Sequence, residues 1–323
     1  MRCAFHSDYF VPLPPGHPFP MAKYPLLLER LLAERVVTAE DLIEPQEACL
    51  DDLALLHAAG YLDRLSRGSL DAAEIRRIGV PWSAALWRRS RLAAQGTLDA
   101  ARAALEDGLA ANLAGGTHHA FADHGEGFCV LNDIAVAVRV LQRERRARTA
   151  LVVDLDVHQG NGTAAIFEDD PAVFTFSMHG ERNYPARKMR SRLDVGLPDG
   201  LGDDGYLELL SVSLSRIFEG FAPDVVFYLA GVDPAQGDRY GRLALSDEGL
   251  RRRERHVLQA CLDRELPAVV TLAGGYAASP ERTAELHAIV IREAVALTGA
   301  ARDHCTHPSR STAGTPAHRP APE

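Results

Sequence analysis

The sequence lacks several features that would place it in large classes of protein. Its five cysteines lie far apart and form no Cys-x-x-Cys pair, which argues against a disulfide framework and a cysteine zinc site. The formal net charge is −9, so nucleic-acid binding is not expected. No apolar run approaches the length of a membrane span, and residues 1–10 carry no signal-peptide run. We therefore expect a cytoplasmic protein in a reducing compartment.

The chain does have the apolar content of one large domain. Of its 323 residues, 46% are hydrophobic, which is enough for the core of an α/β domain. Residues 1–302 are predicted to form that domain, because no linker interrupts them. After this point the composition turns to Pro, Ser, Thr, Ala and His, which predicts a disordered tail over residues 303–323. The basic run at residues 251–253 lies between glutamates and is predicted to be a solvated helix face.

The hydrophobic pattern predicts helices alternating with buried strands. Short apolar runs without clean alternation are typical of parallel strands covered on both faces. Helical segments between several of these runs predict a doubly wound α/β layer sandwich. Strands are expected at residues 150–155, 172–176, 225–230 and 268–273, with another at 111–114; helices are expected at 25–35, 84–113 and 131–148, and a loop at 12–20.

The strongest chemical signal begins within the strand expected at residues 150–155. The segment reads Asp154-Leu-Asp156-Val-His158-Gln-Gly-Asn161-Gly-Thr. In an extended backbone Asp154, Asp156 and His158 share one face, because side chains alternate along a strand. Two carboxylates and an imidazole are costly to bury together without a cation, and both groups are good zinc ligands. The competing interpretation is an acid-rich strand end that caps the next helix.

Other polar residues follow the remaining strands. Taken alone, Asp233 would more often be a helix cap than a ligand, and Tyr276 an ordinary half-buried tyrosine. The adjacent His118 and His119 would more often be surface residues of a loop. Open α/β sheets gather their sites at the carboxyl ends of strands, so all four residues are expected to meet there. A set of two aspartates and one histidine leaves a position open for water and substrate, as catalytic zinc sites do.

Five segments, in this order, resemble the zinc-dependent histone deacetylases, and the resemblance spans residues 3–297. Three further segments, at residues 77–82, 177–185 and 237–243, look most like the class IV branch and its bacterial relatives. Two positions depart from the pattern: Tyr240 stands where leucine is usual, and Asn161 where class I members carry aspartate. The five segments are Gly-Gly-Thr-His118-His119, Gly127-Phe128-Cys129-Val-Leu-Asn132-Asp133, Asp154-Leu-Asp156-Val-His158-Gln-Gly-Asn161-Gly-Thr, Ala-Gly-Val-Asp233 and Gly274-Gly275-Tyr276.

The resemblance implies the three-layer arginase–deacetylase fold, an α/β architecture with a central parallel sheet of about eight strands flanked by helices. It implies that Asp156, His158 and Asp233 bind a catalytic Zn²⁺, or Fe²⁺ in its place. A structural K⁺ is implied beside Asp154, Asp156, His158, Ser177 and Met178, partly through backbone carbonyls. The implied lining of a substrate tunnel is Gly127, Phe128, Tyr184, Gly274 and Gly275.

The implied reaction is hydrolysis of the amide on an acylated lysine of a protein or peptide, or on an acylated small amine. His119, in contact with Asn161, is the candidate general base. His118, hydrogen-bonded to Asp154, would support it electrostatically. Tyr276 would donate its O–H to the developing oxyanion. The class IV resemblance also implies acyl groups longer than acetyl, and the short loop at residues 179–185 leaves room for them. The oligomeric state is not indicated.

Two alternatives stay open. An arginase-like ureohydrolase needs Asp-x-His-x-Asp clusters to bridge two metal ions, whereas the order here is Asp-x-Asp-x-His. A catalytically silent protein that recognises acylated partners would keep the same pocket, because a fold does not guarantee a reaction.

Overall fold

Eight short strands form one parallel sheet, and β3, β4, β5, β7 and β8 lie where buried apolar runs predict strands. The computed structural model describes residues 1–306. The strand order is β2-β1-β3-β8-β7-β4-β5-β6, and neighbouring strands run parallel throughout. This confirms the predicted parallel sheet. The strands are β1 (Arg2–Ala4), β2 (Leu42–Ile43), β3 (Leu109–Asn112), β4 (Ala150–Asp154), β5 (Val173–Gly180), β6 (Leu193–Leu197), β7 (Val225–Leu229) and β8 (Ala268–Thr271).

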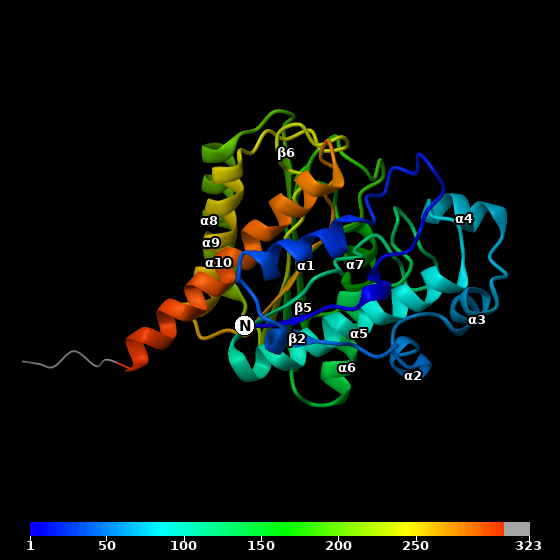
Figure 1. The fold of residues 1–323 in the computed structure, drawn as a ribbon, viewed down its shortest axis with the longest axis horizontal. Helices are drawn as coiled ribbons and strands as arrows, with labels where there is room; N and C mark the ends of the chain where they lie inside the picture. The colour runs from blue at the N-terminus through cyan, green and yellow to red at the C-terminus, as the bar shows by residue number, and fades with distance from the viewer. Residues whose placement is uncertain (307–323) are drawn as a thin grey trace, which may run out of the picture.

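Helices cover both faces of the sheet, so the molecule has three layers (Figure 1). On one side α8, α9 and α10 lie together and α1 packs against α10, while α5 and α6 pack together on the other. The helices are α1 (Lys23–Ala33), α2 (Leu50–Leu53), α3 (Ala59–Arg67), α4 (Ala72–Ile78), α5 (Ala84–Asp107), α6 (Asp133–Arg143), α7 (Asn161–Phe167), α8 (Asp203–Gly220), α9 (Asp247–Leu262) and α10 (Pro280–Thr306), with the short 3₁₀ turns η1 (Ser7–Tyr9) and η2 (Ala39–Asp41).

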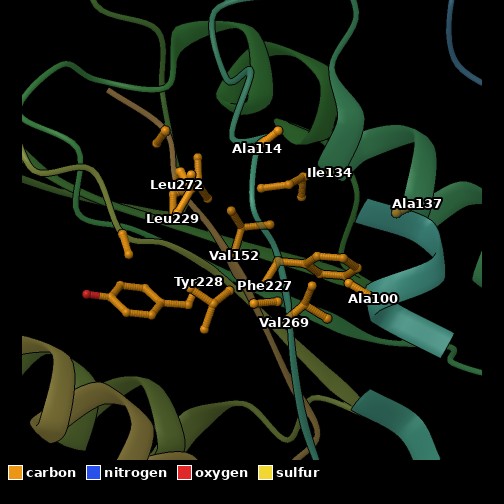
Figure 2. Packing of buried hydrophobic residues seen from close by; sticks show 14 of the residues in the cluster. Ala100, Ala114, Ile134, Ala137, Val152, Phe227, Tyr228, Leu229, Val269 and Leu272 are labelled. Atoms are coloured by element: carbon orange, nitrogen blue, oxygen red, sulfur yellow. The ribbon is translucent and has the colours of Figure 1, made fainter. Parts of the chain in front are cut away.

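The alternation of side chains along β7 joins the two helix layers through the sheet. Figure 2 shows Phe227 pointing toward Ala100 of α5 and Tyr228 pointing to the opposite side. The Tyr228 hydroxyl donates to the Glu254 carboxylate on α9. Every residue of β4, β7 and β8 is buried, which explains why these strands have no polar face in the sequence.

Two predicted helices are shorter in the structure. The helix expected over residues 84–113 ends at Asp107, because Gly108 takes a positive φ of 85° and β3 starts directly after it. The helix expected over residues 131–148 is α6 (Asp133–Arg143), and the chain turns away at Arg145, where φ is 59°. An apolar run continues after α5 and a basic run after α6, and neither run by itself shows where the helix stops.

The prediction of a solvated basic face at residues 251–253 is wrong for Arg253. This side chain is fully buried on α9, beside the buried Glu254 at 2.5 Å. Its guanidinium donates to the carbonyl oxygens of Leu155 and Gly231, at 3.2 and 2.8 Å. Arg253 therefore holds the backbone of two neighbouring strand ends, a role that a run of three arginines does not reveal.

The helix α10 continues to Thr306, past the domain boundary predicted at residue 302. The remainder of the predicted tail, residues 307–323, lies outside the described residues. Among residues 1–306, no helix is both long enough and apolar enough to cross a membrane.

His57 offers a test of the packing by pH. Its ring is buried, Nε2 accepts the Asn132 N–H at 3.1 Å, and Nδ1 lies 3.3 Å from the Ala122 carbonyl. Burial lowers the pKa of His57 from 6.5 to about 4. The unfolded chain therefore binds a proton in this window that the folded chain does not, and stability is lost as the pH falls from 6.5 toward 4.

His57→Gln should weaken this acid sensitivity, because an amide can keep polar contacts but does not titrate. The slope of the unfolding free energy against pH is expected to fall by up to about 1.4 kcal/mol per pH unit between pH 6.5 and 4. Urea unfolding of both proteins at several pH values measures the two slopes. If the unfolding free energies of the wild type and of His57→Gln have equal slopes between pH 6.5 and 4, the lowered pKa of His57 is wrong.

Candidate active site

The four central strands carry the predicted site at their carboxyl ends. The neighbours β3, β8, β7 and β4 lead, respectively, into the loops of the His pair, of Tyr276, of Asp233, and of Asp156 with His158. Parallel neighbours end at the same edge of a sheet, so segments far apart in the chain meet there. The strand expected at residues 150–155 ends at Asp154, so the backbone is not extended through His158. A turn follows instead, in which Asp156 Oδ1 accepts the His158 N–H at 2.9 Å.

Asp156, His158 and Asp233 form a buried cluster with the spacing of metal ligands. One ligand atom from each residue lies within 4.8 Å of the others. His158 Nδ1 is 3.0 Å from Asp156 Oδ1 and 3.1 Å from Asp233 Oδ2. The other carboxylate oxygens accept backbone N–H groups, Asp156 Oδ2 from Gly274 at 2.6 Å and Asp233 Oδ1 from Val157 at 2.8 Å. Both carboxylates are therefore held in place independently of any ion.

This donor set fits a divalent cation. Burial and the neighbouring Asp156 carboxylate raise the pKa of Asp233 to about 7. Burial disfavours a charged His158, but the hydrogen bonds to both carboxylates outweigh it and raise the pKa of His158 to about 10. The cluster thus favours positive charge at its centre. Carboxylate oxygen and imidazole nitrogen suit Zn²⁺ or Fe²⁺, and three protein ligands leave a coordination position open.

The two adjacent histidines have different electrostatic surroundings. His118 Nδ1 donates to Asp154 Oδ2 at 2.7 Å, as predicted. Burial opposes its charge, but the carboxylates of Asp154 and Asp156 raise the pKa of His118 to about 9. His119 Nδ1 instead pairs with Asn161 Oδ1 at 2.7 Å, and burial followed by the charge of His118 lowers the pKa of His119 well below 6.5. Near neutral pH, His118 is the cation and His119 is the neutral imidazole that can accept a proton.

The loop after β8 fixes Tyr276 through its backbone. Its N–H donates to Asp238 Oδ2 at 2.7 Å, and its carbonyl accepts the Arg239 N–H at 3.0 Å. Its ring packs edge-on against Tyr240, with 5.0 Å between centroids, so the departure from leucine at this position contributes to the site. Burial, and then the charge of Asp233, raises the pKa of Tyr276 well above 10. The hydroxyl therefore stays protonated and can donate a hydrogen bond.

Two cavities adjoin at the cluster, because both are lined by His119, His158 and Tyr276. The larger, of about 320 Å³, is also lined by Gly127, Phe128 and Tyr184, the residues predicted for a tunnel. The smaller, of about 40 Å³, is also lined by Phe19, Tyr24, Arg89, Asp156 and Gly274.

The two glycines predicted for the tunnel have different surroundings. A Cβ at Gly274 would lie 2.1 Å from Asp233 Oδ2, so only glycine lets this backbone approach the carboxylates. Gly275 lines neither cavity, and its place in a tunnel stays a prediction. A Cβ at Gly275 would lie 2.5 Å from Val232 Cγ2, so its small size serves packing behind the loop.

Two of the residues predicted for a potassium ion, Asp156 and His158, belong to the cluster, and the other three lie on strands β4 and β5. Ser177 of β5 is paired in register with Asp154 of β4, and both side chains are buried. The Ser177 hydroxyl is hydrogen-bonded to His179 Nδ1 at 2.9 Å, and Met178 is fully buried. A potassium site at these residues stays a prediction.

Three charged residues at the site escaped the sequence interpretation. Lys23 is fully buried and its Nζ donates to the carbonyl of Ala273 at 2.9 Å; burial lowers the pKa of Lys23 to about 8. Arg89 is buried, donates to a backbone carbonyl and lines the smaller cavity. Glu126 Oε1 accepts the side-chain amide of Asn161 at 2.8 Å. Lys23 and Arg89 come from segments with no site motif, and Glu126 lies directly before the Gly127-Phe128-Cys129 motif without a role assigned to it. Their contacts with the site were therefore visible only once the segments had packed.

Comparison with solved structures defines the class of this protein. An HDAC homolog determined in complex with SAHA matches with a TM-score of 0.79 and 27% identity, over 91% of this chain and 84% of that one. Together with the eight-stranded parallel sheet, this likeness confirms the predicted three-layer arginase–deacetylase fold.

The sequence comparisons define the family. The histone deacetylase domain matches residues 17–293, and the chain belongs to the histone deacetylase family. An uncharacterized protein of Picosynechococcus sp. is 49% identical over 93% of this chain and 97% of its own length. Histone deacetylase 2 of Arabidopsis thaliana is 31% identical over 82% of this chain and 71% of its own. Membership of this family supports hydrolytic deacetylation of an acylated amine, as the sequence predicted.

Proposed function

We propose that this chain is a metal-dependent lysine deacylase that hydrolyses the amide of an acylated lysine, or of a similar acylated amine. The observation that carries the proposal is the convergence of three kinds of group on one cavity wall. The ligand cluster reaches this space through Asp156 and His158, with Asp233 buried behind them, and the neutral His119 and the protonated Tyr276 line the same space. An amide bound there would meet a site for a metal ion, a proton acceptor and a hydrogen-bond donor, and amide hydrolysis uses all three.

The chain's own residues divide the proton chemistry. A divalent ion held by the three ligands supplies Lewis acidity toward a carbonyl oxygen and toward water. His119 takes the proton of the attacking water and later delivers it to the leaving amine nitrogen. His118, charged through its bond to Asp154, stabilises negative charge that develops nearby. Tyr276 donates its hydroxyl hydrogen to the oxyanion, and the free amine and the carboxylate then leave.

The finer assignments belong to the same proposal. The class IV branch is supported by the segments at residues 77–82, 177–185 and 237–243. Zn²⁺ or Fe²⁺ is the proposed catalytic ion, with K⁺ as a structural ion beside Ser177 and Met178. The proposed compartment is the cytoplasm. The proposed partners are acylated lysines of proteins or peptides, or acylated small amines, and not nucleic acid.

One experiment separates this proposal from the two alternatives. The purified protein is assayed on an acetyl-lysine peptide and on a guanidinium substrate, with and without added Zn²⁺. Zn²⁺-dependent release of acetate, which leaves a free lysine side chain on the peptide, with no urea formed, supports the deacylase. Urea release would support a ureohydrolase, although one ligand cluster of the required spacing was found among residues 1–306, and that enzyme class needs two ions. Peptide binding without turnover would support the silent binding protein.

The acyl group is proposed to be short. The space beside Asp156, between Phe19, Tyr24 and Arg89, is about 40 Å³, which favours acetyl over the longer fatty acyl groups that the class IV resemblance implies. In kcat/KM, acetyl-lysine is expected to exceed octanoyl- and myristoyl-lysine on one peptide by about tenfold or more. Phe19→Ala should narrow this ratio, and Phe10→Ala, at an exposed residue that lines neither cavity, should leave it unchanged. If the wild-type enzyme prefers myristoyl-lysine, the substrate carries a long acyl group, as the class IV resemblance implies.

A further inference from the structure

Glu126 lies beside the His119–Asn161 pair, although no motif assigned it a role. Its side chain is about one fifth exposed (19%). The backbone on either side is held in a small antiparallel bridge, with Glu126 N–H donating to Cys129 O at 3.0 Å and Cys129 N–H donating to Glu126 O at 2.8 Å. The carboxylate oxygen Oε1 accepts Asn161 Nδ2 at 2.8 Å and the Tyr184 hydroxyl at 2.5 Å. The backbone of Glu126 and its carboxylate are therefore both held in place.

These contacts determine which end of the Asn161 amide faces His119. A carboxylate only accepts hydrogen bonds, whereas an amide has one accepting oxygen and one donating nitrogen. Asn161 must turn its nitrogen toward Glu126, and its oxygen then faces His119 Nδ1 at 2.7 Å. The reversed amide would place two accepting oxygens against each other. Both Asn161 and His119 are buried, so water does not readily replace either bond.

The orientation of the amide in turn selects the tautomer of His119. A neutral imidazole carries one hydrogen, and the other nitrogen holds the lone pair. Because Nδ1 faces an accepting oxygen, Nδ1 carries the hydrogen and Nε2 carries the lone pair. Among the described residues, no protein group is hydrogen-bonded to Nε2, and the His119 ring lines both cavities. A base that takes a proton from water in the cavity needs this tautomer.

We infer that Glu126 is a positioning residue that selects the proton-accepting tautomer of His119 by orienting the Asn161 amide. The inference rests on the proposed function, because it assumes that His119 acts as the base. An aspartate in place of Asn161 would need no such partner, since both of its oxygens accept. An asparagine does need one, because its two ends differ and a flip would put the hydrogen on Nε2.

Tyr184 provides a matched control for this inference. Its hydroxyl donates to the same Glu126 oxygen, and its ring packs edge-on against His119 with 5.0 Å between centroids. Tyr184→Phe removes one hydrogen bond from Glu126 but leaves the bond to Asn161. It should change KM, because Tyr184 lines the larger cavity, while the hydrogen on the His119 ring should stay on Nδ1 as in the wild type.

The test is ¹⁵N-histidine NMR of the Zn²⁺-loaded full chain, with the His119 signals assigned from their loss in His119→Gln. The wild type should show hydrogen on Nδ1. In Glu126→Ala the signals should shift toward hydrogen on Nε2, and kcat should fall by about tenfold or more, within the range of general-base catalysis. The amide of Glu126→Gln can present either oxygen or nitrogen to Asn161. Its His119 signals and its kcat should therefore lie between those of the wild type and those of Glu126→Ala.

The double variant Glu126→Ala with Asn161→Asp makes the test specific. The double variant should restore hydrogen on Nδ1 of His119 and most of kcat. Asn161→Asp alone places its carboxylate against that of Glu126, so its kcat should be lower than that of the double variant. A wild-type tautomer and wild-type kcat in Glu126→Ala would overturn the inference. So would a failure of the double variant to regain Nδ1–H. If the wild type hydrolyses no acyl-lysine while the tautomer still follows Glu126, the proposed function fails and the orienting role of Glu126 is supported.

Discussion

Replacing Tyr276 by phenylalanine is expected to lower kcat by about 10²–10³-fold, as the loss of an oxyanion donor does in other enzymes. The change removes one hydroxyl and almost no volume. The backbone contacts of Tyr276 with Asp238 and Arg239 do not involve that hydroxyl, so the loop should keep its position. KM should change little, because the lost hydrogen bond forms mainly in the transition state.

The control for this prediction is the metal content, which should stay at the wild-type value because Tyr276 is not one of the three ligands. Tyr240→Phe is a matched variant, since Tyr240 lines the same cavity and packs edge-on against Tyr276. It also loses a tyrosine hydroxyl, and its kcat should stay close to the wild type. A Tyr276→Phe variant with nearly unchanged kcat would show that the oxyanion is stabilised elsewhere.

Asp233→Ala is expected to abolish tight metal binding and measurable deacylation together. The variant removes one of the three proposed protein ligands, and it leaves the Val157 N–H without its carboxylate acceptor. The wild type should hold about one catalytic divalent ion per chain, because three protein ligands define one open site. Elemental analysis of dialysed protein measures the ion, and an acetyl-lysine peptide assay measures the activity.

Asp233→Asn separates ligand loss from misfolding. The amide oxygen can still accept the Val157 N–H, so the turn after β4 should be preserved while the ligand loses its charge. We expect weaker metal binding with thermal stability nearer to the wild type than that of Asp233→Ala. Full metal occupancy in the alanine variant would mean that the ligand assignment is wrong.

Much of the fold could be predicted because its strands carry a local signal. The buried runs that became β4, β7 and β8 are apolar, apart from Asp154 and Thr271 at the ends of β4 and β8, and such runs are typical of strands covered on both faces. The residues at which the helices end were harder to predict. Gly108 ends α5 and Arg145 follows α6 through positive φ angles, within apolar or basic sequence that continues past them. Local composition predicts that a segment is buried, but the end of an element depends on what it packs against.

The sequence by itself determined the ligand cluster, the His pair and the tyrosine, because each follows a strand and parallel strands end at one edge of a sheet. Only the tertiary structure decided how these groups are held. Arg253 faces inward from a basic run, Lys23 reaches the carbonyl of Ala273, and Glu126 orients Asn161. Such contacts join side chains from segments far apart in the chain. Their partners depend on the distance and direction set by packing, which no pattern along one segment contains.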